Sequence, residues 1–319
     1  MFVWTLTCPR TGLLREWNKM RWEKTYGLSS IVFSWFLLGS MGLATRAAVV
    51  YGFTAGPIAL ARTLTQLFGG IILAVFLRQP WSIKNMRVLI CLGAFGGVAV
   101  LTFTLALQAT TAARATILNY TFIPISNLIA ILLDKDRPSS LFWVSLVAGG
   151  LGLWIILDPF KTSSFGQVQS TLLGDAWGLL SGFCAGAYIY LLKRQRETEN
   201  SFGIYLTYSF FALICSIPAF WLGNITPGYQ ASSELTYLGW VALFSVGLLA
   251  LVGHLFNTLA FKYVSLESGT ICALVAPVTA AAGGWLLLEE PLSFRLIFGG
   301  ILVLISCLLT GLYEAKRRI

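Results

Sequence analysis

Two stretches with the same pattern of prolines and acidic residues decide the fold: Leu274–Pro291, "LVAPVTAAAGGWLLLEEP", and Phe122–Pro138, "FIPISNLIAILLDKDRP". Each is an apolar run with a proline near its start, and each ends in acidic residues shortly before a second proline. In water such a run would read as a helix broken at the internal proline, because proline lacks the N–H that continues a helix. The question is which class of protein uses such a segment twice.

Composition indicates the class. The chain is 57% hydrophobic and only 11% charged, with a mean hydropathy of +0.78, whereas a soluble domain carries about 25% charged residues. The apolar residues form blocks near the length of about 20 residues that spans a bilayer, where backbone groups must bond within a helix. We therefore predict an all-α polytopic membrane protein with ten transmembrane helices, at 28–50, 55–77, 87–108, 113–133, 140–157, 172–192, 202–222, 235–260, 266–288 and 293–313.

The positive charges predict the orientation. With the N-terminus inside and ten crossings, 17 of the 22 Lys and Arg but only eight of the 13 Asp and Glu fall on the inner side. The whole net charge of +9 then faces the cytoplasm, as the positive-inside rule expects. Both termini are predicted to be cytoplasmic, and the basic balance needs no nucleic acid to explain it.

The two halves of the chain repeat. A shift of 153 residues places Pro124 on Pro277 and Pro138 on Pro291 without a gap. A unit of five helices leaves the membrane on the side opposite its entry, so the second copy is inverted, which is an architecture of alternating-access carriers. The predicted divisions are a cytoplasmic or interfacial segment 1–26, a first five-helix repeat 27–160, a second, inverted repeat 161–313 and a basic cytoplasmic tail 314–319.

The second copy carries a family resemblance. Residues 261–293, "FKYVSLESGTICALVAPVTAAAGGWLLLEEPLS", resemble the ninth helix and following turn of EamA-type members of the drug/metabolite transporter superfamily. Glu289-Glu290-Pro291 matches the acidic end of that family's half-repeat, and Asp136-Arg137-Pro138 is a looser match. The resemblance implies a ten-helix carrier of small metabolites, with a central cavity lined mainly by helices 1, 3, 4, 6, 8 and 9, in a bacterial inner membrane.

Several residues are candidates for the working parts. Pro124 and Pro277 are predicted hinges, because a mid-helix proline frees a carbonyl and bends the helix. His254, the only histidine, lies deep in its helix and is either a proton carrier or a neutral hydrogen-bonding partner. The substrate-binding candidates are Trp35, Gly39, Thr104, Gln108, Asn119, Tyr120, Gly182, Gly186, Tyr188, His254 and Asn257.

The glycines and the charged residues have plainer interpretations. Gly174, Gly178, Gly182 and Gly186 share a helix face, which favours close helix packing and leaves substrate space only if that face borders the cavity. Buried arginines need partners, so ion pairs are favoured over a grip on a substrate carboxylate or phosphate. The predicted charged network consists of Arg46, Arg62, Arg114, Asp175 and Glu267.

These residues predict a secondary transporter of small polar metabolites, with amino acids or amino-acid derivatives preferred. The alternative within transport is an exchanger of S-adenosylmethionine or nucleotide-type metabolites. An intramembrane enzyme using Ser181 and His254 is the alternative of another class, but no oxyanion-forming loop accompanies that pair. We expect no cofactor and no bound metal; the expected partners are the substrate and the lipid bilayer. The oligomeric state is left open, and a monomer is compatible with the sequence.

Overall fold

Helices form all the regular structure in the part of the chain that the computed structural model describes, which is residues 10–79, 84–109, 112–135, 138–157, 172–225, 237–288 and 294–317. They are, in order, α1 (Arg10–Val50), α2 (Ala55–Phe76), α3 (Met86–Ala109), α4 (Ala112–Asn119), α5 (Phe122–Asp134), α6 (Ser140–Leu157), α7 (Leu172–Gln195), α8 (Ser201–Ser216), α9 (Ala219–Ile225), α10 (Tyr237–Ala260), α11 (Leu266–Ile271), the 3₁₀ turn η1 (Cys272–Leu274), α12 (Val275–Leu288) and α13 (Phe294–Arg317). The all-α prediction is therefore confirmed for these residues.

Six helical stretches are long and apolar enough to cross a membrane. They are Thr25–Thr45 of α1, α2, α3, α7, the stretch Ser201–Leu222 and α10. Four further apolar helical stretches are shorter: Phe122–Asp134, Ser140–Gly152, Leu266–Thr279 and Ile297–Ser306. The protein is thus a polytopic helical membrane protein, while the ten crossings, the inverted relation of the halves and the cytoplasmic termini stay predictions.

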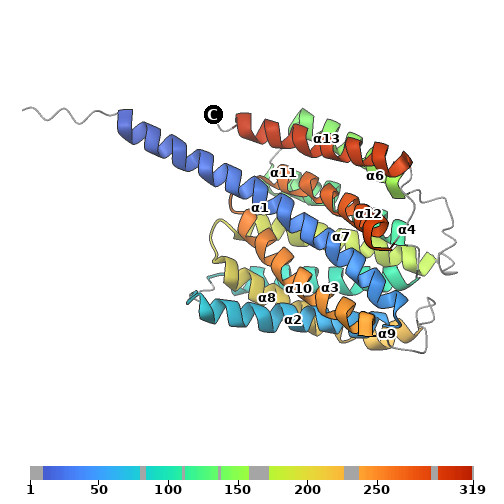
Figure 1. Cartoon of the computed structure of the whole chain (residues 1–319). Helices are drawn as coiled ribbons and strands as arrows, with labels where there is room; N and C mark the ends of the chain where they lie inside the picture. The colour runs from blue at the N-terminus through green and yellow to red at the C-terminus, as the bar shows by residue number, and fades with distance from the viewer. Residues whose placement is uncertain are drawn as a thin grey trace, which may run out of the picture.

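The first helix is longer than the sequence predicted. α1 runs without interruption from Arg10 to Val50, across the boundary predicted at residue 26 between an interfacial segment and the first crossing. No proline follows Arg10 before the helix ends, and the backbone therefore keeps its hydrogen-bonding ladder through Gly27. In Figure 1 the N-terminal part of α1 extends beyond the other helices.

Three predicted crossings are interrupted next to a proline. The fourth divides into α4 and α5 at Tyr120 and Thr121, and the ninth divides at η1. Both interruptions lie about one turn before the proline, because its ring collides with the carbonyl four residues earlier. The seventh, predicted as one helix over 202–222, also breaks at Ile217 and Pro218, between α8 and α9. Pro218 has no N–H for the preceding turn, and this break was not predicted.

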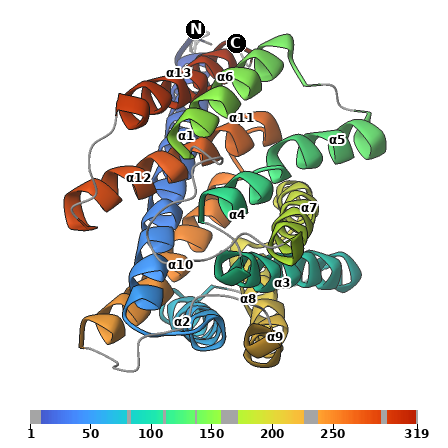
Figure 2. The same ribbon diagram turned by 90° about the vertical axis from the view of Figure 1, so that its right-hand side faces the viewer.

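The helices pack in pairs that correspond between the halves. α1 packs along α10 and α12, while α3 packs along α7 and α8. Figure 2 views the bundle from one end and places these two groups beside each other. α6 and α13 pack together at the edge of the bundle.

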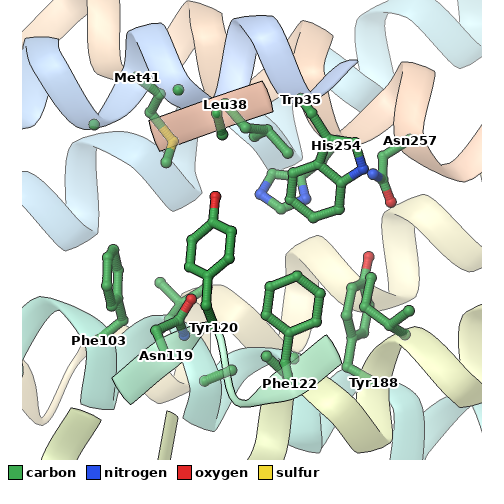
Figure 3. Close-up of a pocket in the computed structure, with 18 of the residues that line it drawn as sticks. Trp35, Leu38, Met41, Phe103, Asn119, Tyr120, Phe122, Tyr188, His254 and Asn257 are labelled. Atoms are coloured by element: carbon green, nitrogen blue, oxygen red, sulfur yellow. The ribbon is translucent and has the colours of Figure 1, made fainter. Parts of the chain in front are cut away.

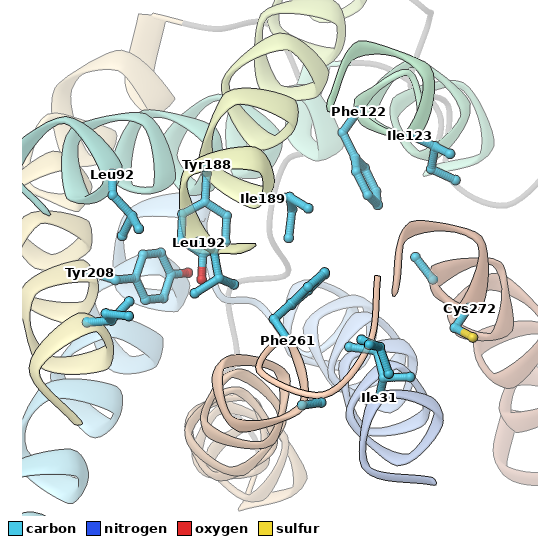
Figure 4. Close-up of a cluster of buried hydrophobic side chains, with 14 of the residues drawn as sticks. Ile31, Leu92, Phe122, Ile123, Tyr188, Ile189, Leu192, Tyr208, Phe261 and Cys272 are labelled. Atoms are coloured by element: carbon cyan, nitrogen blue, oxygen red, sulfur yellow. The ribbon is translucent and has the colours of Figure 1, made fainter. Parts of the chain in front are cut away.

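A cluster of buried side chains joins the two groups of helices. It includes Ile31 of α1, Leu92 of α3, Leu192 of α7, Tyr208 of α8 and Phe261 just after α10, and Figure 4 shows them converging. Lipid does not drive these apolar side chains together, so close packing stabilises the contact.

Charged side chains at one end of the bundle bond mainly to backbone groups. The Glu199 carboxylate accepts hydrogen bonds from the N–H groups of Lys84 (2.9 Å) and Asn85 (2.7 Å). Arg196 donates to the carbonyls of Thr258 (2.8 Å) and Glu199 (2.7 Å). Burial lowers the pKa of the Arg196 guanidinium from its ordinary value, and these carbonyls compensate part of the lost hydration.

Two more carboxylates at that end form hydrogen bonds between neighbouring elements of the chain. Asp134 accepts hydrogen bonds from Tyr190 (2.7 Å) and from Arg194, and Glu267 accepts from the N–H and hydroxyl of Ser139 (3.2 and 3.1 Å). The loops that the charge pattern assigned to one side therefore do contact one another in the structure.

Candidate functional site

A cavity of about 190 Å³ lies between the two groups of helices. The helices predicted to line it all contribute: α1, α3, α4 with α5, α7, α10 and α12. Arg62 of α2 and Tyr208 of α8 add one side chain each. Tyr208 was not among the predicted residues, and Arg62 was predicted as part of the charged network, with a grip on a substrate carboxylate or phosphate as the alternative.

Arg62 and His254 meet at the cavity wall. An Nη atom of Arg62 lies 3.0 Å from Nε2 of His254, and the Tyr208 hydroxyl lies 3.4 Å from the same nitrogen. A guanidinium can only donate, so Nε2 must accept and the imidazole must be neutral with its proton on Nδ1. The geometry therefore matches the neutral-partner interpretation of His254.

Three side chains at this wall have buried polar atoms without a partner among the described residues. They are the Arg62 Nε, the His254 Nδ1 and both amide atoms of Asn257. The Arg62 side chain is only 8% exposed and Asn257 only 1%. In Figure 3 the Tyr188 hydroxyl points toward the Asn257 amide. Such unpaired groups are costly in a protein interior, and a cluster of them on residues that line a cavity indicates a ligand site.

The opposite wall is held by the interrupted helices. The Tyr120 hydroxyl, at the break between α4 and α5, donates to the carbonyl of Ala273 in η1 (3.0 Å). Ala273 lies four residues before Pro277, which has no N–H to offer that carbonyl. Tyr120 and Ala273 are also equivalent positions under the 153-residue shift, so the two breaks are joined directly to each other.

Replacing Tyr120 by phenylalanine should cost about 1–2 kcal/mol of unfolding free energy, because the Ala273 carbonyl loses this donor. Thermal or denaturant unfolding of the purified protein in detergent measures the loss. Tyr26→Phe is the matched control, since the Tyr26 side chain is 43% exposed. Equal stability of the two variants would show that the bond between the breaks contributes nothing.

The aromatic candidates are packed against neighbours. The Trp35 indole N–H donates to the Gly269 carbonyl (3.1 Å), and its ring stacks on Phe122 with centroids 5.8 Å apart. The Tyr188 ring lies 4.9 Å from that of Tyr208. These rings form a fixed, largely apolar wall.

The predicted candidates divide between the cavity and helix contacts. Trp35, Gly39, Asn119, Tyr120, Tyr188, His254, Asn257 and the hinge Pro277 line the cavity. Thr104, Gln108, Gly182, Gly186 and the hinge Pro124 are not among its lining residues.

The glycine ladder serves packing in the structure. A Cβ on Gly182 would meet the Leu118 carbonyl oxygen at 2.6 Å, and one on Gly186 would meet Ile125 at 2.7 Å. The glycines therefore face α4 and α5, because the rotation of α7 turns them away from the cavity. Spacing alone does not determine that rotation.

The prediction that Arg62 belongs to a network of charged residues is not matched by its observed partner. Its hydrogen-bond partner is His254, and it has no carboxylate partner among the described residues. Glu267 is bonded to Ser139 instead. The side chains of Arg46 and Arg114 lie outside the described residues.

Ser181 and His254 do not form a nucleophile–base pair. The Ser181 hydroxyl donates to the Ala99 carbonyl (3.1 Å) and accepts from the Asn119 amide (2.7 Å). Ser181 thereby positions Asn119, which does line the cavity. The described residues also contain no group of three or more His, Cys, Asp or Glu that could hold a metal ion.

Comparisons with known proteins find transporters that are similar to this chain. Residues 172–312 match the model of the EamA-like transporter family. The chain is 27% identical over 250 residues to the pseudopaline exporter CntI of Pseudomonas aeruginosa, covering 75% of this chain and 81% of the relative. It is 24% identical over 296 residues to a protein of Archaeoglobus fulgidus described as an uncharacterized transporter, covering 89% of this chain and 96% of the relative.

A solved crystal structure has the same fold. It superimposes with a TM-score of 0.70 at 15% sequence identity, over 92% of this chain and 97% of that chain. At this identity the likeness concerns the fold alone.

Proposed function

We propose that this chain is a membrane transporter of the EamA type and that it moves small polar metabolites across a cell inner membrane by alternating access. The observation that carries the proposal is the position of the cavity, which lies between interrupted helices at equivalent places in the two halves. Carriers built from inverted repeats hold their substrate near such interruptions.

The helix contacts support the inverted relation of the halves. In the predicted repeat, α1 corresponds to α7, α2 to α8 and α3 to α10. The contact of α1 with α10 therefore has its counterpart in that of α7 with α3, and the contact of α2 with α10 in that of α8 with α3. The contact of α12 with α1 becomes that of α5 with α7 in the same way. A pseudo-two-fold relation of this kind allows the two halves to exchange roles as the cavity changes sides.

One end of the cavity is closed by packing. Val100, Phe122, Tyr188, Ile189 and Tyr208 belong both to the cavity lining and to the buried cluster of Figure 4. The same cluster includes Leu192 of α7, which lies one helical turn before Arg196 at the end where the loops are bonded. A seal on one side of the substrate is what one state of alternating access requires.

The preferred substrates are amino acids or amino-acid derivatives. The space of about 190 Å³ is small beside drug-sized sites of roughly 300–1,000 Å³. The relative in Pseudomonas aeruginosa exports pseudopaline, a metallophore, so exported metallophores join the compounds to be tested. An S-adenosylmethionine or nucleotide-type exchanger is the alternative, and because the family consists of transporters the intramembrane-enzyme alternative loses its support.

Counterflow in proteoliposomes tests the proposal. Vesicles are loaded with pooled amino acids, a metallophore such as pseudopaline, S-adenosylmethionine and nucleotide sugars, and one labelled compound is offered outside at a time. We expect one class to accumulate, and we expect a Pro124→Ala, Pro277→Ala double variant to lose at least about 90% of the initial rate, because both helix breaks would be filled.

A third proline supplies the control. Pro57 lies in the first turn of α2, where a missing N–H costs no helical hydrogen bond, so Pro57→Ala should keep the rate. Accumulation that survives in the double variant would separate transport from the interrupted helices. Absence of accumulation for every compound in the pool would reject the substrate classes named above.

A further inference from the structure

We propose that the cavity wall formed by Arg62, Tyr188, His254 and Asn257, here called the Arg62 wall, binds a carboxylate group of the substrate. Such a site would restrict the substrates to small carboxylates with an apolar body, amino acids included. The inference rests on the transport function proposed above and names the chemical group by which the substrate is held. Its centre is the Arg62 guanidinium, which carries a positive charge and can only donate hydrogen bonds.

Arg62 has no anionic partner among the described residues. Its hydrogen-bond partner there is the neutral ring of His254, and its buried Nε–H has no acceptor in the same part of the chain. Among the described residues, no aspartate or glutamate lines the cavity. A buried arginine in a membrane protein pairs with an anion, a carbonyl or a substrate. The described residues that line this cavity offer Arg62 no anionic side chain.

The neighbouring groups complete a set of donors. The Nδ1–H of His254 and the Asn257 amide N–H groups are buried and have no partner among the described residues, and the Tyr188 hydroxyl points toward the Asn257 amide (Figure 3). All three residues line the same cavity as Arg62. Oxygens of a carboxylate accept several such bonds, while Asn257 Oδ1 is left as an acceptor that suits an ammonium group.

The charge of this wall favours a carboxylate over a phosphate. Arg62 supplies one positive charge, and the other groups are neutral. A carboxylate brings one negative charge and neutralises the site, whereas a phosphate near its second ionisation would leave excess negative charge in an apolar cavity, which is costly. A cationic substrate without a carboxylate would be repelled by Arg62.

The rest of the cavity fits an apolar body. Leu38, Met41, Phe103 and Phe122 line it, and Figure 3 shows these side chains around the space below and beside His254. An aromatic or large aliphatic group can pack there while the carboxylate meets Arg62. Aromatic carboxylates are therefore suitable probes.

The test compares ligands that differ only in the carboxylate. The full chain is purified in detergent, and thermal unfolding is followed with L-phenylalanine, 3-phenylpropionate and the corresponding amides, L-phenylalaninamide and 3-phenylpropanamide. We expect both carboxylates to raise the unfolding midpoint and both amides to leave it within error. Arg62→Gln should weaken carboxylate binding at least about tenfold, since a buried charge-assisted bond is lost.

Two further variants keep the result interpretable. Arg62→Lys retains the charge but loses the guanidinium fork, so it should fold and still bind at least about tenfold more weakly. Arg87→Gln removes an arginine that is exposed and should bind like the unmodified protein. Protection by the amides equal to that by the carboxylates, carboxylate binding that survives Arg62→Gln and Arg62→Lys, or no protection by any of the four probes would each overturn the site.

Counterflow separates this inference from the transport function. Transport of a compound without a carboxylate, in a protein that binds no carboxylate probe, would remove the site and leave the transporter. Carboxylate binding that depends on Arg62, without accumulation of any compound, would leave the site and remove the proposed transport substrates.

Discussion

Replacing His254 by leucine is expected to lower the free energy of unfolding by about 3 kcal/mol. The substitution leaves the Arg62 Nη–H without the acceptor that lies 3.0 Å away. Arg62 is 8% exposed, so solvent cannot readily replace that acceptor. Equilibrium unfolding in mixed detergent micelles, with tryptophan fluorescence as the signal, measures the loss.

Two companion variants identify the cause. His254→Gln keeps an amide oxygen that can accept from Arg62, so it should lose less than half as much stability as His254→Leu. The double variant Arg62→Leu, His254→Leu removes the uncompensated charge and should be more stable than His254→Leu alone. A double variant that is the least stable of the three would mean that leucine at position 254 disrupts packing, and that the hydrogen bond is not the cause.

Much of the fold followed from the sequence because bilayer and proline constraints are local. A backbone that must bond within its own helix needs an apolar run of sufficient length, and apart from the start of α1 at Arg10 the predicted runs begin and end within a few residues of the observed helical stretches. The breaks before Pro124 and Pro277 follow from the missing N–H and the ring. The same reasoning applied to Pro218 would have found the break between α8 and α9.

The site was less accessible to sequence reasoning because it depends on helix rotation. Arg62 and His254 are 192 positions apart, and no local pattern pairs them. Tyr208 closes the same wall, but it stands in an apolar helix where an aromatic side chain is ordinary. A lone arginine in α2 and a lone histidine in α10 were the available signals, since both are costly in a membrane unless each finds a partner.

Gly39→Ala is expected to destabilise the contact between α1 and the second interrupted helix. A Cβ at Gly39 would lie 2.8 Å from the Cα of Ala276 and 3.0 Å from its carbonyl carbon. These are backbone atoms next to Pro277, so they cannot turn aside as the end of a flexible side chain can. Overpacking of this kind costs typically about 1–3 kcal/mol, and it would push α1 away from α12 at the cavity.

Gly42 on the same helix isolates this effect. A Cβ at Gly42 would meet nothing within 4 Å, although Gly42 also lines the cavity. Both substitutions gain the same helix propensity, about 1 kcal/mol from glycine to alanine, so the difference in unfolding free energy between the two variants measures the packing term alone. We expect Gly39→Ala to be the less stable by about 1–3 kcal/mol and to lose counterflow. Equal stability would show that α1 and α12 can separate freely at this point, and the close approach beside Pro277 would then have no part in holding the two halves together.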